Sequence, residues 1–169
     1  MKKYLLIIVS LAFFSTGIFG QTSIPKAQSM FIYNFSRLIE WPAGFSTGDF
    51  VIGVLGHSDI ANELKAYTTG KKVGVQSIKV EEYKDPAEIG KCNILFVSFG
   101  KTKEMPAILS KIGGSSTLII AEKRGACDDG AAINFLIVNN ALKFEIKPSN
   151  AKNGIKLSSK LSDMATEVY

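Results

Sequence analysis

The sequence predicts an α/β fold: a single-domain, Rossmann-like three-layer arrangement with a mixed, mostly parallel sheet and a C-terminal antiparallel hairpin. Three observations predict it. Short apolar runs of strand length alternate with amphipathic segments, as in parallel sheets covered by helices. No repeat or linker divides the 169 residues, a length at which one domain buries a real core. Near the end, two alternating runs flank Asn139-Asn140, a pair suited to the positive φ of a tight turn.

The N-terminus has the three regions of a secretory signal peptide. Lys2 and Lys3 precede an apolar run from Tyr4 to Phe14, and small or weakly polar residues continue to Gly20. The expected domains are therefore a signal peptide at 1–20 and an exported domain at 21–169. An uncleaved anchor is the alternative, but the run is short of the ~20 residues that span a bilayer. Without Lys2 and Lys3, the chain has 18 of its 20 basic residues and 15 acidic residues. This mild excess of positive charge does not indicate a nucleic-acid-binding surface.

The exported part begins with a predicted aromatic helix. Ser23 is placed to cap it, Pro25 fits its first turn, and Pro42 is expected to stop it. Apolar residues recur on one face at spacings of three and four: Ala27, Phe31, Phe35, Leu38 and Trp41. Further apolar side chains widen this face, so the helix is either packed on both sides or partly offered to a partner.

Four strands are predicted after this helix. Three runs are apolar throughout, as in buried parallel strands: Phe50 to Leu55, Ile94 to Val97 and Leu118 to Ala121. The segment from Val73 to Tyr83 alternates between apolar and charged residues, which indicates a half-exposed edge strand.

Helices are predicted between and after these strands. Capping residues and glycines bound one from Ser58 to Gly70 and another from Pro106 to Gly113. A closing helix is expected from Lys160 to Tyr169, with Leu161, Met164 and Val168 turned inward.

The predicted hairpin has two unlike faces. Its register sets Ile137 against Leu142, Phe135 against Phe144 and Ile133 against Ile146, an apolar ladder that must lie against a larger layer. The other face carries Asn134 opposite Glu145, with Lys143 beside them. A mixed polar and apolar face is typical of contact surfaces, and a solvated face is the alternative.

No pattern in the sequence assembles a catalytic, cofactor or metal centre. His57, the single histidine, follows the first buried strand, where open α/β sheets bind ligands, but no triad or metal-ligand spacing accompanies it. The carboxylates in the polar loop Glu122 to Ala131 have no nearby partner, which is typical of solvated residues. We therefore expect neither an enzyme nor a resident cofactor or metal.

A disulfide between Cys92 and Cys127 is judged unlikely. Export favours oxidation, so a bridge is the first hypothesis. However, Cys92 precedes one predicted parallel strand and Cys127 follows another, at opposite ends of a sheet roughly 17 Å long, whereas a bridge needs Cα atoms within about 7 Å. A long loop that folds back is the arrangement that would still permit the bridge.

Several segments together resemble the YfiR family, which was first described only as a domain of unknown function. The C-terminal signature is INF, FEI and GIKLSSKL, and upstream matches are FIYNFSRLIEWP, GVLG and CNILFVS. The resemblance covers nearly all of the chain after residue 24. It implies that Cys92 and Cys127 each correspond to one member of two separate disulfides found in other members. Redox control by those disulfides is therefore not carried over from the resemblance.

The resemblance implies a non-enzymatic negative regulator in the periplasm. Proteins of this family bind the periplasmic sensory domain of an inner-membrane diguanylate cyclase and hold it inactive, within cyclic-di-GMP signalling. An outer-membrane lipoprotein can sequester the regulator, a histidine kinase could replace the cyclase in other lineages, and family members form homodimers.

The expected partner-binding residues come from two sources. The family motifs FEI and GIKLSS match at Glu145, Ile146, Lys156 and Ser158, and Trp41 is added because it lies beside the expected helix end. The alternative function is a periplasmic small-molecule sensor, with a pocket formed by His57 and the loop at 122–131 at the strand ends.

Overall fold

The structure is a computed structural model that describes residues 22–56 and 59–169. The signal peptide expected at 1–20, the ligand residue His57 and the helix cap expected at Ser58 lie outside the described residues. In the described part, no helix combines the length and apolar character needed to cross a bilayer.

The described strands form an eight-stranded sheet in the order β10-β8-β7-β6-β5-β2-β4-β3. The neighbouring strands β4, β2, β5, β6 and β7 run parallel to one another. β3 is antiparallel to β4, β8 is antiparallel to β7, and β10 runs parallel to β8. The predicted mixed, mostly parallel sheet is thus confirmed. The strands are β2 (Phe50–Leu55), β3 (Lys72–Val73), β4 (Gln76–Tyr83), β5 (Ile94–Val97), β6 (Leu118–Ala121), β7 (Ile133–Val138), β8 (Ala141–Ile146) and β10 (Glu167–Val168).

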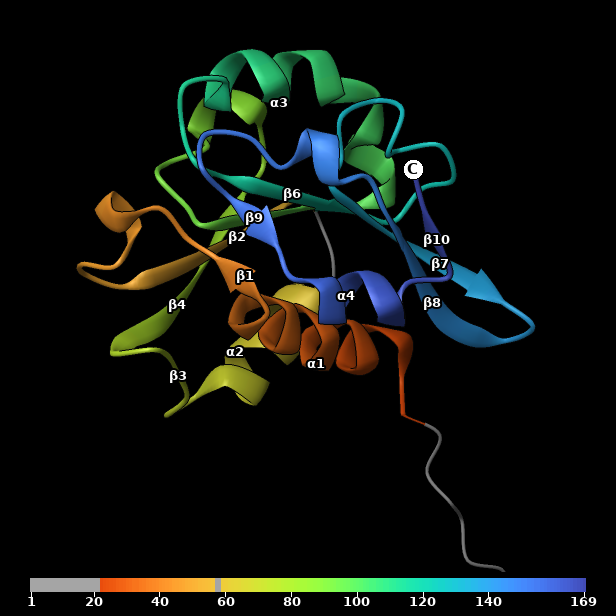
Figure 1. Cartoon of the computed structure of the whole chain (residues 1–169), viewed down its shortest axis with the longest axis horizontal. Helices are drawn as coiled ribbons and strands as arrows, with labels where there is room; N and C mark the ends of the chain where they lie inside the picture. Colours follow the sequence, from red (N-terminus) through yellow and green to blue (C-terminus); the bar gives the residue numbers. More distant parts are fainter. Residues whose placement is uncertain (1–21, 57–58) are drawn as a thin grey trace, which may run out of the picture.

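Helices cover both faces of the sheet and complete three layers (Figure 1). One face carries α1 (Ile24–Arg37), α2 (Ile60–Thr68) and α4 (Ser159–Met164), and the other carries α3 (Met105–Ile112). Short 3-10 turns join these elements: η1 (Ala43–Phe45), η2 (Pro86–Glu88), η3 (Phe99–Glu104) and η4 (Pro148–Asn150). A separate two-stranded ribbon pairs β1 (Ile39–Glu40) with β9 (Lys156–Leu157).

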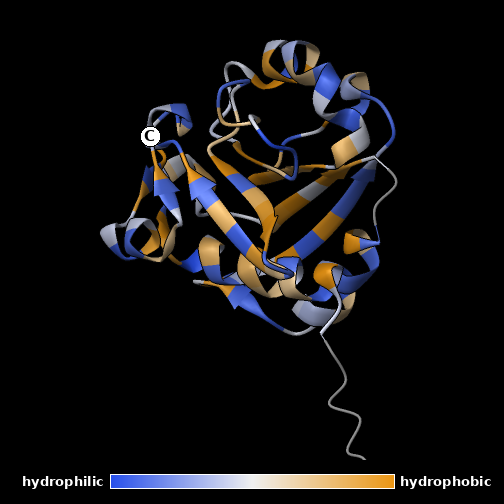
Figure 2. Ribbon diagram, turned by 90° about the vertical axis from the view of Figure 1, so that its right-hand side faces the viewer, coloured by the Kyte–Doolittle hydropathy of each residue, from blue (hydrophilic) through white to orange (hydrophobic). Residues whose placement is uncertain are grey.

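Apolar side chains fill the space on both sides of the sheet. Figure 2, viewed from the hairpin side, shows hydrophobic residues concentrated along the central strands. Phe35 of α1 stacks on Phe135 of β7 at 5.9 Å between ring centroids and contacts Phe144 of β8 at 4.7 Å. The apolar ladder expected on the hairpin therefore packs against α1, and its register is the predicted one, with Ile133 opposite Ile146. Asn139 and Asn140 form the turn with φ of 49° and 61°.

The first helix ends earlier than predicted. Ser23 caps α1 as expected, because its Oγ accepts the Lys26 amide at 3.4 Å. The helix stops at Arg37 and not at Pro42, because Ile39 and Glu40 leave it to pair with β9. Trp41 therefore lies in an extended connection.

The segment from Val73 to Tyr83, which was predicted as a single edge strand, forms a hairpin of two strands. β3 and β4 meet at a turn formed by Gly74 and Val75, and Gly74 has the φ of +59° that a tight turn requires. β3 reaches only Gln76 and Ser77 of β4, so β4 remains close to an edge, as its alternation indicated.

The closing helix is shorter than predicted. α4 ends at Met164, after which the chain extends and adds β10 to the edge of β8. Leu161 is buried as expected, but Met164 and Val168 are 46% and 51% exposed, so their predicted inward orientation is wrong. Strand pairing has overridden the helical periodicity in this segment.

Candidate functional site

The β1–β9 ribbon gathers three of the sequence-predicted site residues. Glu40 of β1 lies opposite Lys156 of β9, which places Trp41 directly after one strand and Ser158 directly after the other. The Ser158 amide also donates to the Leu38 carbonyl at 3.1 Å. Two segments that are far apart in the sequence are thus fixed side by side in front of the main sheet (Figure 1).

Trp41 is anchored on one side and half-exposed on the other. Its indole N–H donates to the Ser36 carbonyl at 3.1 Å, and its ring meets Phe50 edge-on at 5.2 Å between centroids. A half-buried, hydrogen-bonded tryptophan is a typical anchor in protein interfaces.

An open groove lies beside this ribbon, between α1 and α4. Ser158 begins α4, since its Oγ accepts the Leu161 amide at 3.3 Å, and Leu161 points into the core. The groove has a volume of about 340 Å³. Its lining residues are Asn34, Arg37, Leu38, Lys160 and Met164.

The ribbon and this groove together form what we call the ribbon–groove surface: Trp41, Lys156 and Ser158 with the five groove residues. It combines apolar side chains from Leu38, Met164 and Trp41 with the cations of Arg37, Lys156 and Lys160. Glu40, exposed beside Lys156, is its neighbouring carboxylate. The surface suits a partner that offers an apolar side chain flanked by acidic groups.

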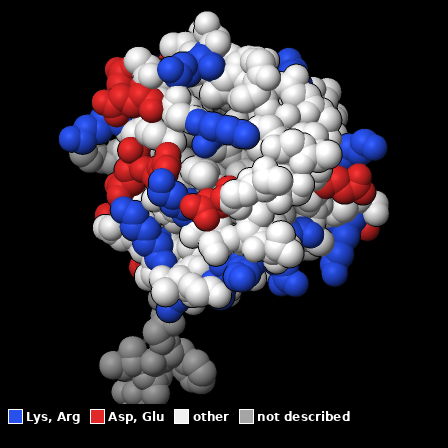
Figure 3. All heavy atoms as spheres, turned by 90° about the vertical axis from the view of Figure 1, so that its left-hand side faces the viewer, with Lys and Arg blue, Asp and Glu red and all other residues white. Residues whose placement is uncertain are grey.

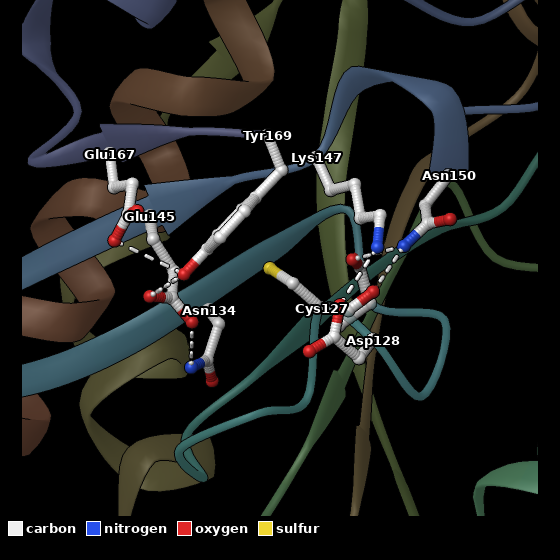
Figure 4. Close-up of polar contacts among 9 residues, drawn as sticks. Cys127, Asp128, Asn134, Glu145, Lys147, Asn150, Glu167 and Tyr169 are labelled. Atoms are coloured by element: carbon white, nitrogen blue, oxygen red, sulfur yellow. Dashed lines mark hydrogen bonds and ion pairs between the residues drawn. The ribbon is translucent and has the colours of Figure 1, made fainter.

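Glu145 and Ile146, the two other predicted contact residues, lie in the interior. Ile146 is fully buried, and Glu145 is only 6% exposed. Glu145 Oε1 accepts the Asn134 side-chain amide at 2.8 Å, and Glu145 Oε2 accepts the Tyr169 hydroxyl at 3.1 Å (Figure 4). The polar face expected to be exposed around Asn134 and Glu145 is therefore covered, and neither Glu145 nor Ile146 offers a surface in this conformation.

The extended C-terminal segment covers that face. Glu167 and Val168 pair with Glu145 and Ile146, and Tyr169 extends its hydroxyl over the Glu145 carboxylate. On the other side, Asn134 Oδ1 accepts the Lys123 amide at 3.1 Å, so the fully buried asparagine has partners at both ends. The sequence analysis missed this arrangement because it predicted one helix from Lys160 to Tyr169.

The loop at 122–131 is tied to neighbouring elements and borders a second groove. Glu122 accepts the Gln28 side-chain amide at 2.8 Å and the Phe99 backbone amide at 3.0 Å. Lys147 Nζ lies 2.8 Å from Asp128 Oδ1, an exposed pair, and this contact raises the pKa of the lysine (Figure 4). Glu122 and Arg124 face an open groove of about 250 Å³ that the hairpin and the start of α1 complete.

Cys92 and Cys127 are free thiols, and both are buried. Burial is the main reason why the pKa of each is raised to about 12. The thiolate, which is the reactive form, is therefore disfavoured at neutral pH. Cys92 lies against Gly53. The backbone carbonyl of Cys127 accepts a hydrogen bond from the Asn150 side-chain amide at 2.7 Å.

Among the described residues, no three His, Cys, Asp or Glu side chains are grouped so that they would hold a metal ion. The structure does provide open grooves, among them the two described above, and one of these is part of the basic, partly apolar ribbon–groove surface. Such features suit reversible binding.

Comparisons with known proteins bear on family and fold. Residues 25–166 match the family model described as YfiR/HmsC-like. No curated protein matches the sequence. Two solved structures share the fold: the ABC domain in complex with L-Trp from Streptococcus pneumoniae, at 14% identity and a TM-score of 0.59, and a conserved domain protein from Vibrio cholerae O1 biovar El Tor, at 9% identity and a TM-score of 0.62. The matches cover 86% and 87% of this chain but only 62% and 60% of those structures.

Proposed function

Because the chain belongs to the YfiR/HmsC-like family, a family of periplasmic regulatory proteins, we propose that it is an exported, non-enzymatic negative regulator. Its target is the periplasmic sensory domain of an inner-membrane diguanylate cyclase, or of a histidine kinase in that position. The regulator acts by binding, since a ligand shifts a receptor's equilibrium only through its differential affinity for the two states. Residues 1–20 serve as the cleaved signal peptide, and an outer-membrane lipoprotein competes for the regulator.

The observation that carries this proposal is the ribbon–groove surface. Lys156 and Ser158 match the family motif, and the structure sets them beside Trp41 and the groove that contains Lys160. An anchored aromatic ring beside cations and an apolar groove has the composition of an interface centre. Glu145 and Ile146 contribute indirectly, because they hold the hairpin and the C-terminal segment in place.

Binding assays with charge-reversed variants test the proposal. The probes are the periplasmic domains of membrane diguanylate cyclases and histidine kinases encoded beside this gene. We expect Lys156→Glu to weaken binding about tenfold or more, as loss of a charged interface contact does, with an unchanged circular dichroism spectrum. Lys152→Glu is the matched control, since Lys152 is also exposed but lies off the surface. Equal affinities of the two variants would remove the ribbon from the interface.

Glu145→Arg does not test a surface contact, although Glu145 is among the partner-binding residues expected from the sequence. It places a cation among buried groups and removes the acceptor of the Asn134 and Tyr169 hydrogen bonds. We expect it to disturb the fold as well as binding, because an unpaired buried charge is costly. It therefore cannot identify a surface contact by itself.

The second candidate function is a periplasmic small-molecule sensor. The groove beside Glu122 and Arg124 supports this proposal, because it gives the loop at 122–131 a hollow in which a ligand could lie, bordered by the hairpin and the start of α1. A thermal-shift screen of anionic metabolites distinguishes the two functions. Saturable stabilisation that Arg124→Ala weakens would support the sensor, and unchanged melting would leave the groove without a ligand.

A further inference from the structure

The outer edge of β4 has a free stretch of backbone. Among the described residues, β3 pairs only with Gln76 and Ser77, while β2 pairs with the opposite side of β4 from Ile78 to Tyr83. The stretch from Ile78 to Glu82 therefore has a strand on one side only. Unpaired strand edges are templates for pairing with another chain.

The direction of the backbone groups along this stretch follows from one hydrogen bond. The Tyr83 carbonyl accepts the Gly56 amide at 2.9 Å, so Tyr83 directs its backbone toward β2. In a strand with a parallel neighbour, the N–H and C=O groups of alternate residues point to opposite sides. Ile78, Val80 and Glu82 therefore point their amides and carbonyls outward, and the free stretch is symmetric about Val80.

Two opposite charges on this stretch lie at equal distances on either side of the same residue. Lys79 and Glu81 flank Val80 and lie on one face of the sheet, where Lys79 Nζ is 2.7 Å from a Glu81 carboxylate oxygen. Both side chains are accessible, at 58% and 30%. Figure 3, viewed from the side where β3 and β4 lie, shows acidic and basic side chains intermingled on that face.

We propose that β4 pairs antiparallel with β4 of a second copy of this chain, about a two-fold axis at Val80. Val80 then lies opposite Val80 of the second copy, and Lys79 lies opposite Glu81 of the second copy in two equivalent contacts. Ile78 pairs with Glu82 in the same way, which gives about six backbone hydrogen bonds across the axis. An isologous interface of this kind closes at two copies.

Charge complementarity identifies the second copy as the occupant of this edge. A strand that is unrelated in sequence has no reason to place an acid opposite Lys79 and a base opposite Glu81, whereas this strand does so through its own symmetry. The charges also explain why the edge does not recruit chains at random, since Lys and Glu on an edge disfavour pairing with strands of other sequence. A short edge contact buries little area, so we expect a weak dimer with a dissociation constant of about 10–100 µM.

This interface does not depend on the receptor contact proposed above. In the sheet order, β4 and β8 lie toward opposite edges, and no residue of the free stretch belongs to the ribbon–groove surface. The first helix, which the sequence analysis left as a possible partner surface, packs its aromatic face onto the sheet instead.

Sedimentation velocity of the chain from residue 21 to residue 169 tests the proposal. We expect concentration-dependent dimers for the natural sequence. Lys79→Glu places four acids around the axis and Glu81→Lys places four bases, so each variant should dimerise about tenfold or more weakly. A mixture of the two variants should form heterodimers, and the double variant K79E/E81K should recover the natural dissociation constant.

The control is Lys111→Glu, the same charge change on the exposed part of α3, which should dimerise like the natural chain. Circular dichroism checks that each variant is folded, which matters most for Glu81→Lys because Glu81 also accepts the Tyr83 hydroxyl. A natural chain that stays monomeric at all concentrations would overturn the proposal. So would single variants that dimerise unchanged, or folded variants that fail to associate when mixed. Loss of dimers with intact receptor binding would leave the proposed function standing.

Discussion

The two edge regions of the sheet carry the same pair of side chains in opposite settings. Near one edge, on β8, Glu145 is buried and accepts the hydroxyl of Tyr169, a residue that is 53% exposed. Near the other, on β4, Tyr83 is buried and donates its hydroxyl at 2.7 Å to Glu81, which is only partly covered. The carboxylate is thus inside in one region and outside in the other.

This difference decides what each carboxylate can contribute. Glu145 is away from water and is held by neutral donors, the Asn134 amide and the Tyr169 hydroxyl, so its role is structural. Glu81 is near water and forms an exposed ion pair with Lys79, a contact that adds little to stability and is free to exchange partners. The covered edge therefore maintains the fold, and the open edge is available for association.

The largest expected effect comes from the covered edge. Asn134→Ala removes the donor to Glu145 and the acceptor of the Lys123 amide, and so leaves a buried carboxylate short of a partner. We expect the free energy of unfolding, measured in urea, to fall by about 3 kcal/mol. Lys143→Ala is the control and should change it little, because Lys143 lies on the same face of the hairpin but is exposed toward its tip. A cost for Asn134→Ala as small as the control's would show that this edge is not held by its polar network.

An intermediate effect is expected at Tyr83, and it depends on pH. Burial, followed by the hydrogen bond to Glu81, raises the pKa of the Tyr83 phenol above its ordinary value. A raised pKa means that the folded state favours the neutral phenol. The stability that the neutral Tyr83 phenol gives the fold is therefore fully present below about pH 10, and it is lost as pH rises further. Tyr83→Phe should cost about 1 kcal/mol near neutral pH. It should also lose less stability than the natural chain between about pH 9 and pH 11, measured by urea unfolding.

The smallest effect is expected at Tyr169, where the ring is largely exposed. Tyr169→Phe removes one hydroxyl donor from Glu145 while the Asn134 amide remains. We expect backbone amides of β8 to exchange roughly threefold faster in hydrogen-exchange measurements, since opening of the short β10 becomes easier. Unchanged exchange would mean that backbone pairing alone holds β10 on the sheet.

Sequence reasoning was reliable where pattern and packing agree. The uniformly apolar runs at β2, β5 and β6 could only be buried strands between helices, and Asn139-Asn140 specified both the turn and the register of the hairpin. The sheet and its principal helices therefore followed from local patterns.

The errors arose where a distant segment competes for the same backbone. The helical spacing of α1 continues through Leu38 and Trp41, but Ile39 and Glu40 between them pair with residues more than a hundred positions away. Glu167 and Val168 fit a helix but complete the edge beside β8. No local pattern predicts these pairings, so Glu145 was expected on the surface, whereas it is buried on β8 with β10 beside it and the Tyr169 hydroxyl against its carboxylate.

The candidate site divides in the same way. Lys156 and Ser158 were proposed from a sequence motif, and the pairing of β1 with β9 brings them beside Trp41. Arg37, Lys160 and Met164 were missed, because residues of two helices converge on one groove only in the folded chain. Arg37 and Lys160 come from separate helices, so no fixed spacing in the sequence identifies them as a pair.

The β1–β9 ribbon has a consequence for how the molecule matures. Its two strands join Ile39 to Leu157, so closing this contact requires nearly the whole chain to be present. Contacts of such long sequence separation form slowly and after local structure. A ribosome that delivers the chain from its N-terminus releases Glu40 long before Lys156 exists, and an unfinished polypeptide consequently lacks the very surface that Trp41 and Lys156 build.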